Sequence, residues 1–209
     1  MSNNGITVTA TGAASGPPDR AVLTLGASAI RGEVATALAA VNGKVEKLIQ
    51  ALAGYGLRGA DIQTSDLSIW PEHNTDGAAA GFLVRNTVKI TTTAMDTLGE
   101  LVGAAVSVLG DLAEIHGLRF EVIDPSPLEA QARVRAWSRA HDKARQLADL
   151  AGTRLGHALE VRETSSQEQE FIYAMDLATP KGVLVETGAA GVEVHLKVRF
   201  SQFPKDASG

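Results

Sequence analysis

Several residue types that often decide a protein's chemistry are absent or rare in this 209-residue sequence. There is no cysteine, which excludes disulfides, thiolate nucleophiles and zinc sites built on cysteine. Aromatic residues make up only 4% of the chain, so each of the two tryptophans is a feature to follow. No segment holds the roughly 18 consecutive apolar residues of a membrane-spanning helix, so no membrane span is expected.

An excess of positive charge is also lacking. The net charge is −5 and the isoelectric point is about 5.5, with basic and acidic residues interleaved along the chain. Nucleic-acid-binding domains usually carry a basic patch and a high isoelectric point, so no nucleic-acid partner is expected. The first twelve residues do not combine a cationic start with an apolar run, as a signal peptide does. As written, the sequence predicts a cytoplasmic protein, and a periplasmic or secreted one if a leader has been removed.

Hydrophobic residues account for 44% of the chain, enough to form a buried core without disulfide cross-links. The most extended pattern covers residues 126–152, where Pro127 suits the first helical turn and Gly152 suits the end of the helix. Between them, apolar residues recur every three or four positions and are mostly alanine. These residues are Ala130, Val134, Trp137, Ala140, Ala144, Leu147, Ala148 and Ala151. The pattern predicts a long helix that can lie close against a sheet or another helix.

Two shorter helical patterns cover residues 33–53 and 96–110. Seven segments alternate between apolar and polar residues and predict strands. They are residues 6–11, 20–30, 62–70, 82–93, 118–123, 155–162 and 192–200. Residues 164–191 are the least patterned part and are expected to form a mobile loop or an ill-defined hairpin. Hairpins joined by helices predict an α+β fold, with an antiparallel or mixed sheet and helices packed on one face, in a single domain over residues 1–209.

The sequence contains no recognised catalytic motif: no nucleophile elbow, phosphate-binding loop or dinucleotide-binding glycine pattern follows a strand. No catalytic residue, cofactor-binding residue or cofactor is therefore predicted. After Trp70, a polar loop could present Glu72, His73 and Asp76 to a divalent cation, although such residues also gather in loops for turn chemistry. The long helix carries a basic cluster that could hold phosphates or an acidic partner, or could simply be solvated. Its members are Arg133, Arg135, Arg139, Lys143 and Arg145.

Several segments, taken in order, resemble one known family. The chain reads ITVTATG at residues 6–12, then a strand with Asp19, Ala21 and Leu23. DIQTSDLSIWPEH, GFLVRNTVKITTTAMDTLGELV and GLRFEV follow, and the long helix and a closing VEVHLKVRF complete the set. Together they resemble the SIMPL domain family, which includes bacterial periplasmic immunogenic proteins. Trp137 and His141 depart from the residues common in that helix, which are valine or alanine and aspartate.

The resemblance implies an α+β fold without established catalytic residues, ring-like or channel-like homo-oligomers in some bacterial members, and links to envelope and oxidative stress. The leading hypothesis is therefore a non-enzymatic, self-associating protein with a stress-related or scaffolding role. The predicted oligomer interface consists of Trp137 and the apolar positions of the last strand. Those positions are Val192, Val194, Leu196, Val198 and Phe200. The alternatives are a small-ligand or metal-binding module, using the loop after Trp70 and the basic helix face, and an undescribed hydrolase.

Overall fold

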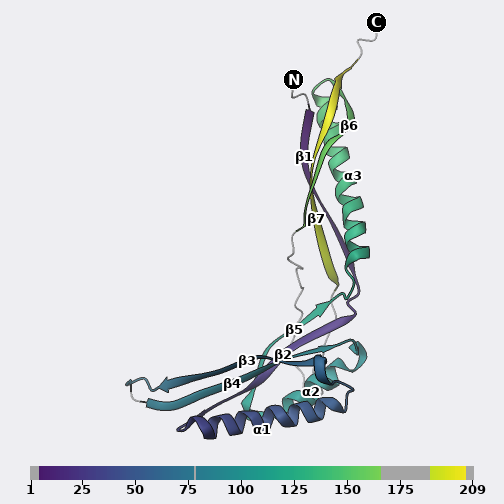
Figure 1. The fold of residues 1–209 in the computed structure, drawn as a ribbon. Helices are drawn as coiled ribbons and strands as arrows, with labels where there is room; N and C mark the ends of the chain where they lie inside the picture. Colours follow the sequence, from purple (N-terminus) through teal and green to yellow (C-terminus); the bar gives the residue numbers. More distant parts are fainter. Residues whose placement is uncertain (1–4, 78, 166–188, 206–209) are drawn as a thin grey trace. The chain divides into compact units, whose positions relative to one another are not determined.

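The computed structural model describes residues 5–77, 79–165 and 189–205, which form three α-helices and seven β-strands (Figure 1). All strand pairs among these residues are antiparallel, and the helices pack on one face of their sheets, so the predicted α+β class is confirmed. The chain divides into two compact units, each described here by itself. The expectation of a single domain over residues 1–209 stays a prediction.

The three-stranded unit contains the two ends of the described chain and the long helix. Its sheet has the order β1-β7-β6, and helix α3 covers one face. The elements are β1 (Gly5–Gly16), α3 (Ser126–Leu150), β6 (Thr153–Ser165) and β7 (Ala190–Pro204). The central strand β7 is therefore paired on both sides.

Helix α3 contacts the sheet through a row of alanines spaced four residues apart, each at most 1% exposed. They are Ala132, Ala136, Ala140, Ala144 and Ala148. The predicted apolar face was wrong in part, because Val134 is 69% exposed and Leu147 is 41% exposed. The reason is size: the small alanine side chains let the helix axis approach the sheet, so the larger residues between them in the sequence are displaced from the contact.

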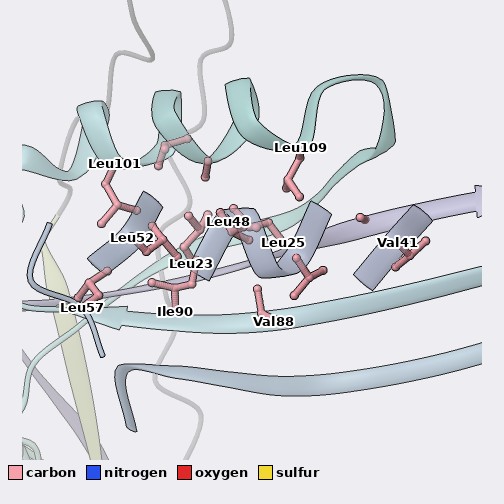
Figure 2. Packing of buried hydrophobic residues seen from close by; sticks show 14 of the residues in the cluster. Leu23, Leu25, Val41, Leu48, Leu52, Leu57, Val88, Ile90, Leu101 and Leu109 are labelled. Carbon is pink, nitrogen blue, oxygen red and sulfur yellow. The ribbon is translucent and has the colours of Figure 1, made fainter. Parts of the chain in front are cut away.

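The four-stranded unit has the sheet order β3-β4-β2-β5. Helices α1 and α2 pack against each other and share a core with one face of this sheet (Figure 2). The elements are β2 (Arg20–Arg31), α1 (Val34–Ala53), β3 (Ile62–His73), β4 (Ala79–Thr92), α2 (Leu98–Leu109) and β5 (Ala113–Glu121). Short 3-10 turns at residues 59–61, 95–97 and 110–112 lie between them.

The core of this unit consists of aliphatic side chains from both layers. Leu25 of β2 and Val88 of β4 pair in register and point toward the helices, where Leu48 of α1 and Leu109 of α2 are also fully buried (Figure 2). Burying each such side chain contributes roughly 1.5–3 kcal/mol. The polar residue Asn86 is also buried, and its Nδ2 donates a hydrogen bond to Asn42 Oδ1 at 3.2 Å. The aliphatic side chains of this core hold the sheet and the two helices together by hydrophobic packing.

The connection predicted to be a loop over residues 164–191 is shorter at both ends than expected. Strand β6 continues to Ser165 and β7 begins at Ala190. Residues 166–188 lie outside the described residues, so the expectation of a mobile loop or hairpin there stays a prediction.

Candidate functional site

The predicted interface strand β7 does not form an edge of its sheet. It pairs with β1 on one side and with β6 on the other. Val194, Leu196, Val198 and Phe200 lie in the core beneath α3 and are each at most 6% exposed. The expectation that this strand could pair with another chain was wrong, because its hydrogen-bonding groups already have two neighbouring strands.

The three metal-ligand candidates lie at the end of β3 and in the turn that follows it. Glu72 and His73 are the last residues of β3, and Asp76 lies in the turn before β4. Within residues 5–77, 79–165 and 189–205, no group of three or more histidine, aspartate or glutamate side chains is arranged to hold a metal ion. The structure therefore does not bring these three residues together as a ligand set.

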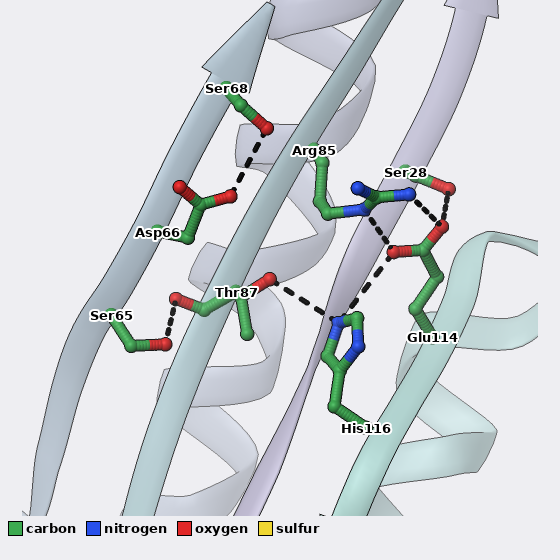
Figure 3. Close-up of polar contacts among 8 residues, drawn as sticks. All are labelled: Ser28, Ser65, Asp66, Ser68, Arg85, Thr87, Glu114 and His116. Carbon is green, nitrogen blue, oxygen red and sulfur yellow. Dashed lines mark hydrogen bonds and ion pairs between the residues drawn. The ribbon is translucent and has the colours of Figure 1, made fainter.

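A polar cluster that the sequence did not predict lies on the face of the four-stranded sheet opposite its helices. Figure 3 shows Glu114 of β5 as its centre. The Glu114 carboxylate accepts hydrogen bonds from Arg85 Nε and from Ser28 Oγ, both at 2.6 Å. The hydrogen bond from Arg85 is the main reason that the pKa of Glu114 is lowered, so this group stays ionised. An ionised carboxylate held by two donors is unsuited to act as a general acid.

His116, beside Glu114, does not complete a catalytic triad. A triad needs the acid on one ring nitrogen of histidine and the nucleophile on the other. Here His116 Nε2 lies both 3.7 Å from Glu114 Oε2 and 3.4 Å from Thr87 Oγ1. Thr87 is also only 5% exposed, so its hydroxyl is not open to a substrate. The hydrogen bonds of Glu114 and His116 instead connect β5 with β4 and β2. They lie next to the register shift between Thr24 and Leu25 in the pairing of β2 with β5.

The same open face carries an apolar row beside the polar cluster. Trp70 of β3, Leu83 of β4 and Ile30 of β2 are partners in register across three strands. Trp70 is 61% exposed and Ile30 is 48% exposed. The next row consists of Ser68, Arg85 and Ser28, so apolar and charged groups lie directly side by side. This face therefore exposes apolar and charged side chains to solvent.

In the three-stranded unit, basic residues of α3 cover the outer edge of β1. Arg135 donates to the carbonyl oxygen of Ala13 at 2.6 Å, and Arg139 donates to that of Thr11 at 2.8 Å. One helical turn further on, the Lys143 ammonium donates to the carbonyl oxygen of Thr9 at 3.3 Å. We call Arg135, Arg139 and Lys143 the edge row. Exposed strand edges template pairing with other chains, and side chains that occupy their carbonyls oppose it.

Gly12 of β1 makes the edge row possible, because it lets the strand approach α3 closely. A Cβ atom at this position would be 2.1 Å from the carbonyl oxygen of Ala132 and 2.4 Å from the backbone nitrogen of Ala136. Real Cβ atoms do not come this close to backbone atoms. The position therefore requires glycine, as close backbone approaches commonly do.

The opposite flank of α3 faces β6 and has a different character. Arg133 forms an ion pair with Glu163 of β6 at 2.9 Å. One turn later, the Trp137 ring lies 5.9 Å from the Phe200 ring, at an interplanar angle of 53°. Trp137 is nevertheless 41% exposed, so it both packs on the sheet and faces solvent. Val134 lies one helical turn before Trp137 and is 69% exposed, and Val161 of β6 is 51% exposed. We call these two residues with Trp137 the β6 flank.

The SIMPL profile, described as "Protein of unknown function (DUF541)", matches residues 6–200. The chain belongs to the SIMPL family. Two curated relatives are each named "26 kDa periplasmic immunogenic protein", one from Brucella melitensis biotype 1 and one from Brucella abortus strain S19. Each is 27% identical over 172 residues, which is 77% of this chain. The SIMPL chain covers 66%, just under two thirds, of each relative's length.

The family description assigns no activity to SIMPL proteins, and the relatives' names describe a location and an immune response rather than a reaction. Within the part of the SIMPL chain that the structure describes, no helix is long and apolar enough to cross a membrane.

Proposed function

We propose that this chain is a non-enzymatic SIMPL protein that associates with copies of itself and has a scaffolding or stress-related role in the periplasm. The observation that carries the self-association is the difference between the two edges of the three-stranded sheet. The β1 edge is occupied by the edge row, whereas β6 has no neighbouring strand on its outer side among the described residues. The β6 edge is bordered by the exposed apolar side chains of the β6 flank.

The β6 flank has the composition of a contact surface. Tryptophan is enriched at the centres of protein interfaces, where it contributes a large contact area. Trp137 is supported from below by Phe200, so its ring is held in place before any partner arrives. An immobilised side chain loses little entropy on association. A second copy of the chain that covered Val134, Trp137 and Val161 would remove apolar area from water and extend the β6 edge.

The distribution of charge also favours contacts between copies. Among the described residues, basic side chains outnumber acidic ones in the three-stranded unit, and acidic side chains outnumber basic ones in the four-stranded unit. Opposite net charges on two associating parts raise the rate of association. The three-stranded unit of one copy thus has an electrostatic partner in the four-stranded unit of another.

The proposed location and stress-related role depend on relatives rather than on geometry. A cytoplasmic location finds no support in the comparisons, because both relatives are named as periplasmic. The stress-related role depends on the family resemblance. A metal-binding module and a hydrolase are less favoured, since Glu72, His73 and Asp76 form no ligand set and His116 uses one nitrogen for two contacts.

Size-exclusion chromatography with light scattering, applied to a matched pair of variants, tests the proposed interface. Val161→Lys places a charge on the β6 flank at a side chain that is already half exposed. Ile49→Lys places the same charge on α1, at a side chain that is 44% exposed. We expect Val161→Lys to reduce the assembly and Ile49→Lys to retain it. Equal behaviour of the two variants, with both folded by circular dichroism, would contradict an interface at the β6 flank.

A further inference from the structure

A basic groove lies along β1 and β7 in the three-stranded unit. Its volume is about 630 Å³. The lining residues are Thr9, Ala10, Thr11, Arg139, Lys143, His195, Leu196 and Lys197. This set has three permanent cations, an imidazole and two hydroxyls, and no carboxylate.

Among the residues that the structure describes, the three cations of the groove have no acidic partner, unlike several other basic residues. Arg85 is paired with Glu114, and Arg133 is paired with both Glu129 and Glu163. The ion pairs found between described residues do not include those of the groove, Arg139, Lys143 and Lys197. Arg139 and Lys143 each use one N–H group on a β1 carbonyl, and a guanidinium has five such groups and an ammonium three. Donors and positive charge therefore remain for a ligand.

Strand register aligns the hydroxyls with the cations. Thr9 is the partner of Lys197 and Thr11 is the partner of His195, and alternate rows such as these lie on one face of the sheet. Thr11 Oγ1 lies 2.8 Å from His195 Nδ1, which fixes the ring beside the hydroxyl. The carboxylate of Glu193, which does not line the groove, lies 3.8 Å from His195 Nε2.

The basic surface continues beyond the groove along β7. A second hollow of about 250 Å³ shares Lys197 and adds Thr7, Arg162 and Arg199, together with Glu160. Glu160 accepts a hydrogen bond from Arg162, so the cation of that pair is already neutralised. Arg199 is the partner of Thr7 in register and repeats the combination of cation and hydroxyl.

We propose that this groove binds a phosphate-type oxyanion, with Arg139, Lys143 and Lys197 supplying the charge and the hydroxyls of Thr9 and Thr11 donating hydrogen bonds. A phosphate group is negatively charged, whether free or in a phosphodiester, and its oxygen atoms present acceptors in several directions. It therefore suits donors that converge from a helix and from two strands. The phosphate group could belong to free inorganic phosphate or to the headgroup of an anionic lipid. The site does not depend on self-association.

Isothermal titration calorimetry with inorganic phosphate, at constant ionic strength set by chloride, tests the site directly. Lys197→Gln is the informative variant, because Lys197 is exposed and makes no bond to the β1 edge, so its loss should leave the fold intact. We expect its affinity for phosphate to fall about tenfold or more. Arg145→Gln, on α3 like Arg139 and Lys143 but outside the groove, should bind as wild type does. Absence of saturable binding to wild type, or equal binding by Lys197→Gln, would overturn the proposal.

Co-sedimentation with vesicles distinguishes the two sources of phosphate. Vesicles of phosphatidylglycerol mixed with phosphatidylcholine present the anionic headgroup, and pure phosphatidylcholine vesicles are the control. Binding to the anionic vesicles that Lys197→Gln weakens and free phosphate competes away supports a headgroup ligand. Binding of phosphate in calorimetry without binding to vesicles supports a free anion. Vesicle binding that Lys197→Gln leaves unchanged would contradict a headgroup ligand at this site.

Discussion

Gly12 and Ala136 lie so close that a Cβ atom on Gly12 would be 2.4 Å from the backbone nitrogen of Ala136. This contact sets how near α3 approaches β1. It also brings the side chains one residue before and three residues after Ala136, Arg135 and Arg139, within reach of the β1 carbonyls. A single glycine and a row of alanines therefore determine both the packing of the helix and the protection of the sheet edge.

The contact predicts that Gly12→Ala is strongly destabilising. The added methyl group would meet backbone atoms that cannot rotate away, so α3 and β1 would have to separate. Overpacking of this kind costs about 1–3 kcal/mol in the free energy of unfolding. Gly43→Ala is the matched control, because Gly43 lies in the interior of α1 with nothing within 4 Å of its added Cβ. It should gain roughly 0.5–1 kcal/mol from helix propensity. Urea denaturation of both variants checks the opposite signs, and a stable Gly12→Ala protein would refute the close approach.

The edge row predicts that its removal exposes β1 to intermolecular pairing. Replacing Arg139 and Lys143 together by methionine keeps most of the aliphatic side chain but removes both donors to the β1 carbonyls. We expect increased light scattering and thioflavin fluorescence on incubation. Arg145→Met is the control for loss of charge on α3, and it should behave as wild type. Similar scattering by the double variant and the control would argue against a protective role.

The Glu114 cluster predicts a specific loss of stability in acid. The pKa of Glu114 is lower in the folded protein than its ordinary value of 4.5, chiefly because Arg85 donates a hydrogen bond to it. The contribution to stability is complete above the unfolded-state pKa and is lost as pH falls through the folded-state pKa, because the unfolded chain then binds the proton more readily. Glu114→Gln should therefore flatten the fall in unfolding free energy below about pH 4.5, the ordinary value. Urea denaturation of wild type and Glu114→Gln across this pH range checks the prediction, and an equally steep fall in both proteins would contradict it.

Trp137→Ala should affect both folding and assembly. The ring packs on Phe200 but is 41% exposed, so truncation should cost about 2 kcal/mol, less than for a fully buried tryptophan. Val134→Ala, at a side chain that is 69% exposed, should change stability by less than about 0.5 kcal/mol. Both variants should weaken the oligomer, since both residues belong to the β6 flank. Urea denaturation measures the effect on stability and light scattering measures the effect on assembly. Unchanged assembly in both variants would show that Trp137 does not belong to the interface.

Much of the secondary structure was predictable because it depends on local patterns. The helices predicted over residues 33–53 and 126–152 agree with α1 and α3 to within a few residues. Strand β1 was predicted to end near Thr11 but continues to Gly16, because its small residues follow β7 in register although they resemble a turn sequence. Two separate sheets were not predictable, since pairing depends on contacts between residues far apart in the sequence.

The sites were less predictable than the fold. The clean alternation of Val192 to Phe200 indicates one buried face, and it does not distinguish a central strand from an edge strand. The spacing of Arg135, Arg139 and Lys143 was visible, but the carbonyl groups that they contact depend on the position of β1. Glu114, Arg85 and Ser28 come from three strands, so only the register of the sheet brings them together.

Sedimentation equilibrium of the unmodified chain, from the low to the high micromolar range, tests the central claim of self-association most directly. Self-association predicts an average mass above the monomer mass of 21.8 kDa that rises with concentration. A single species of 21.8 kDa at every concentration and ionic strength would contradict it.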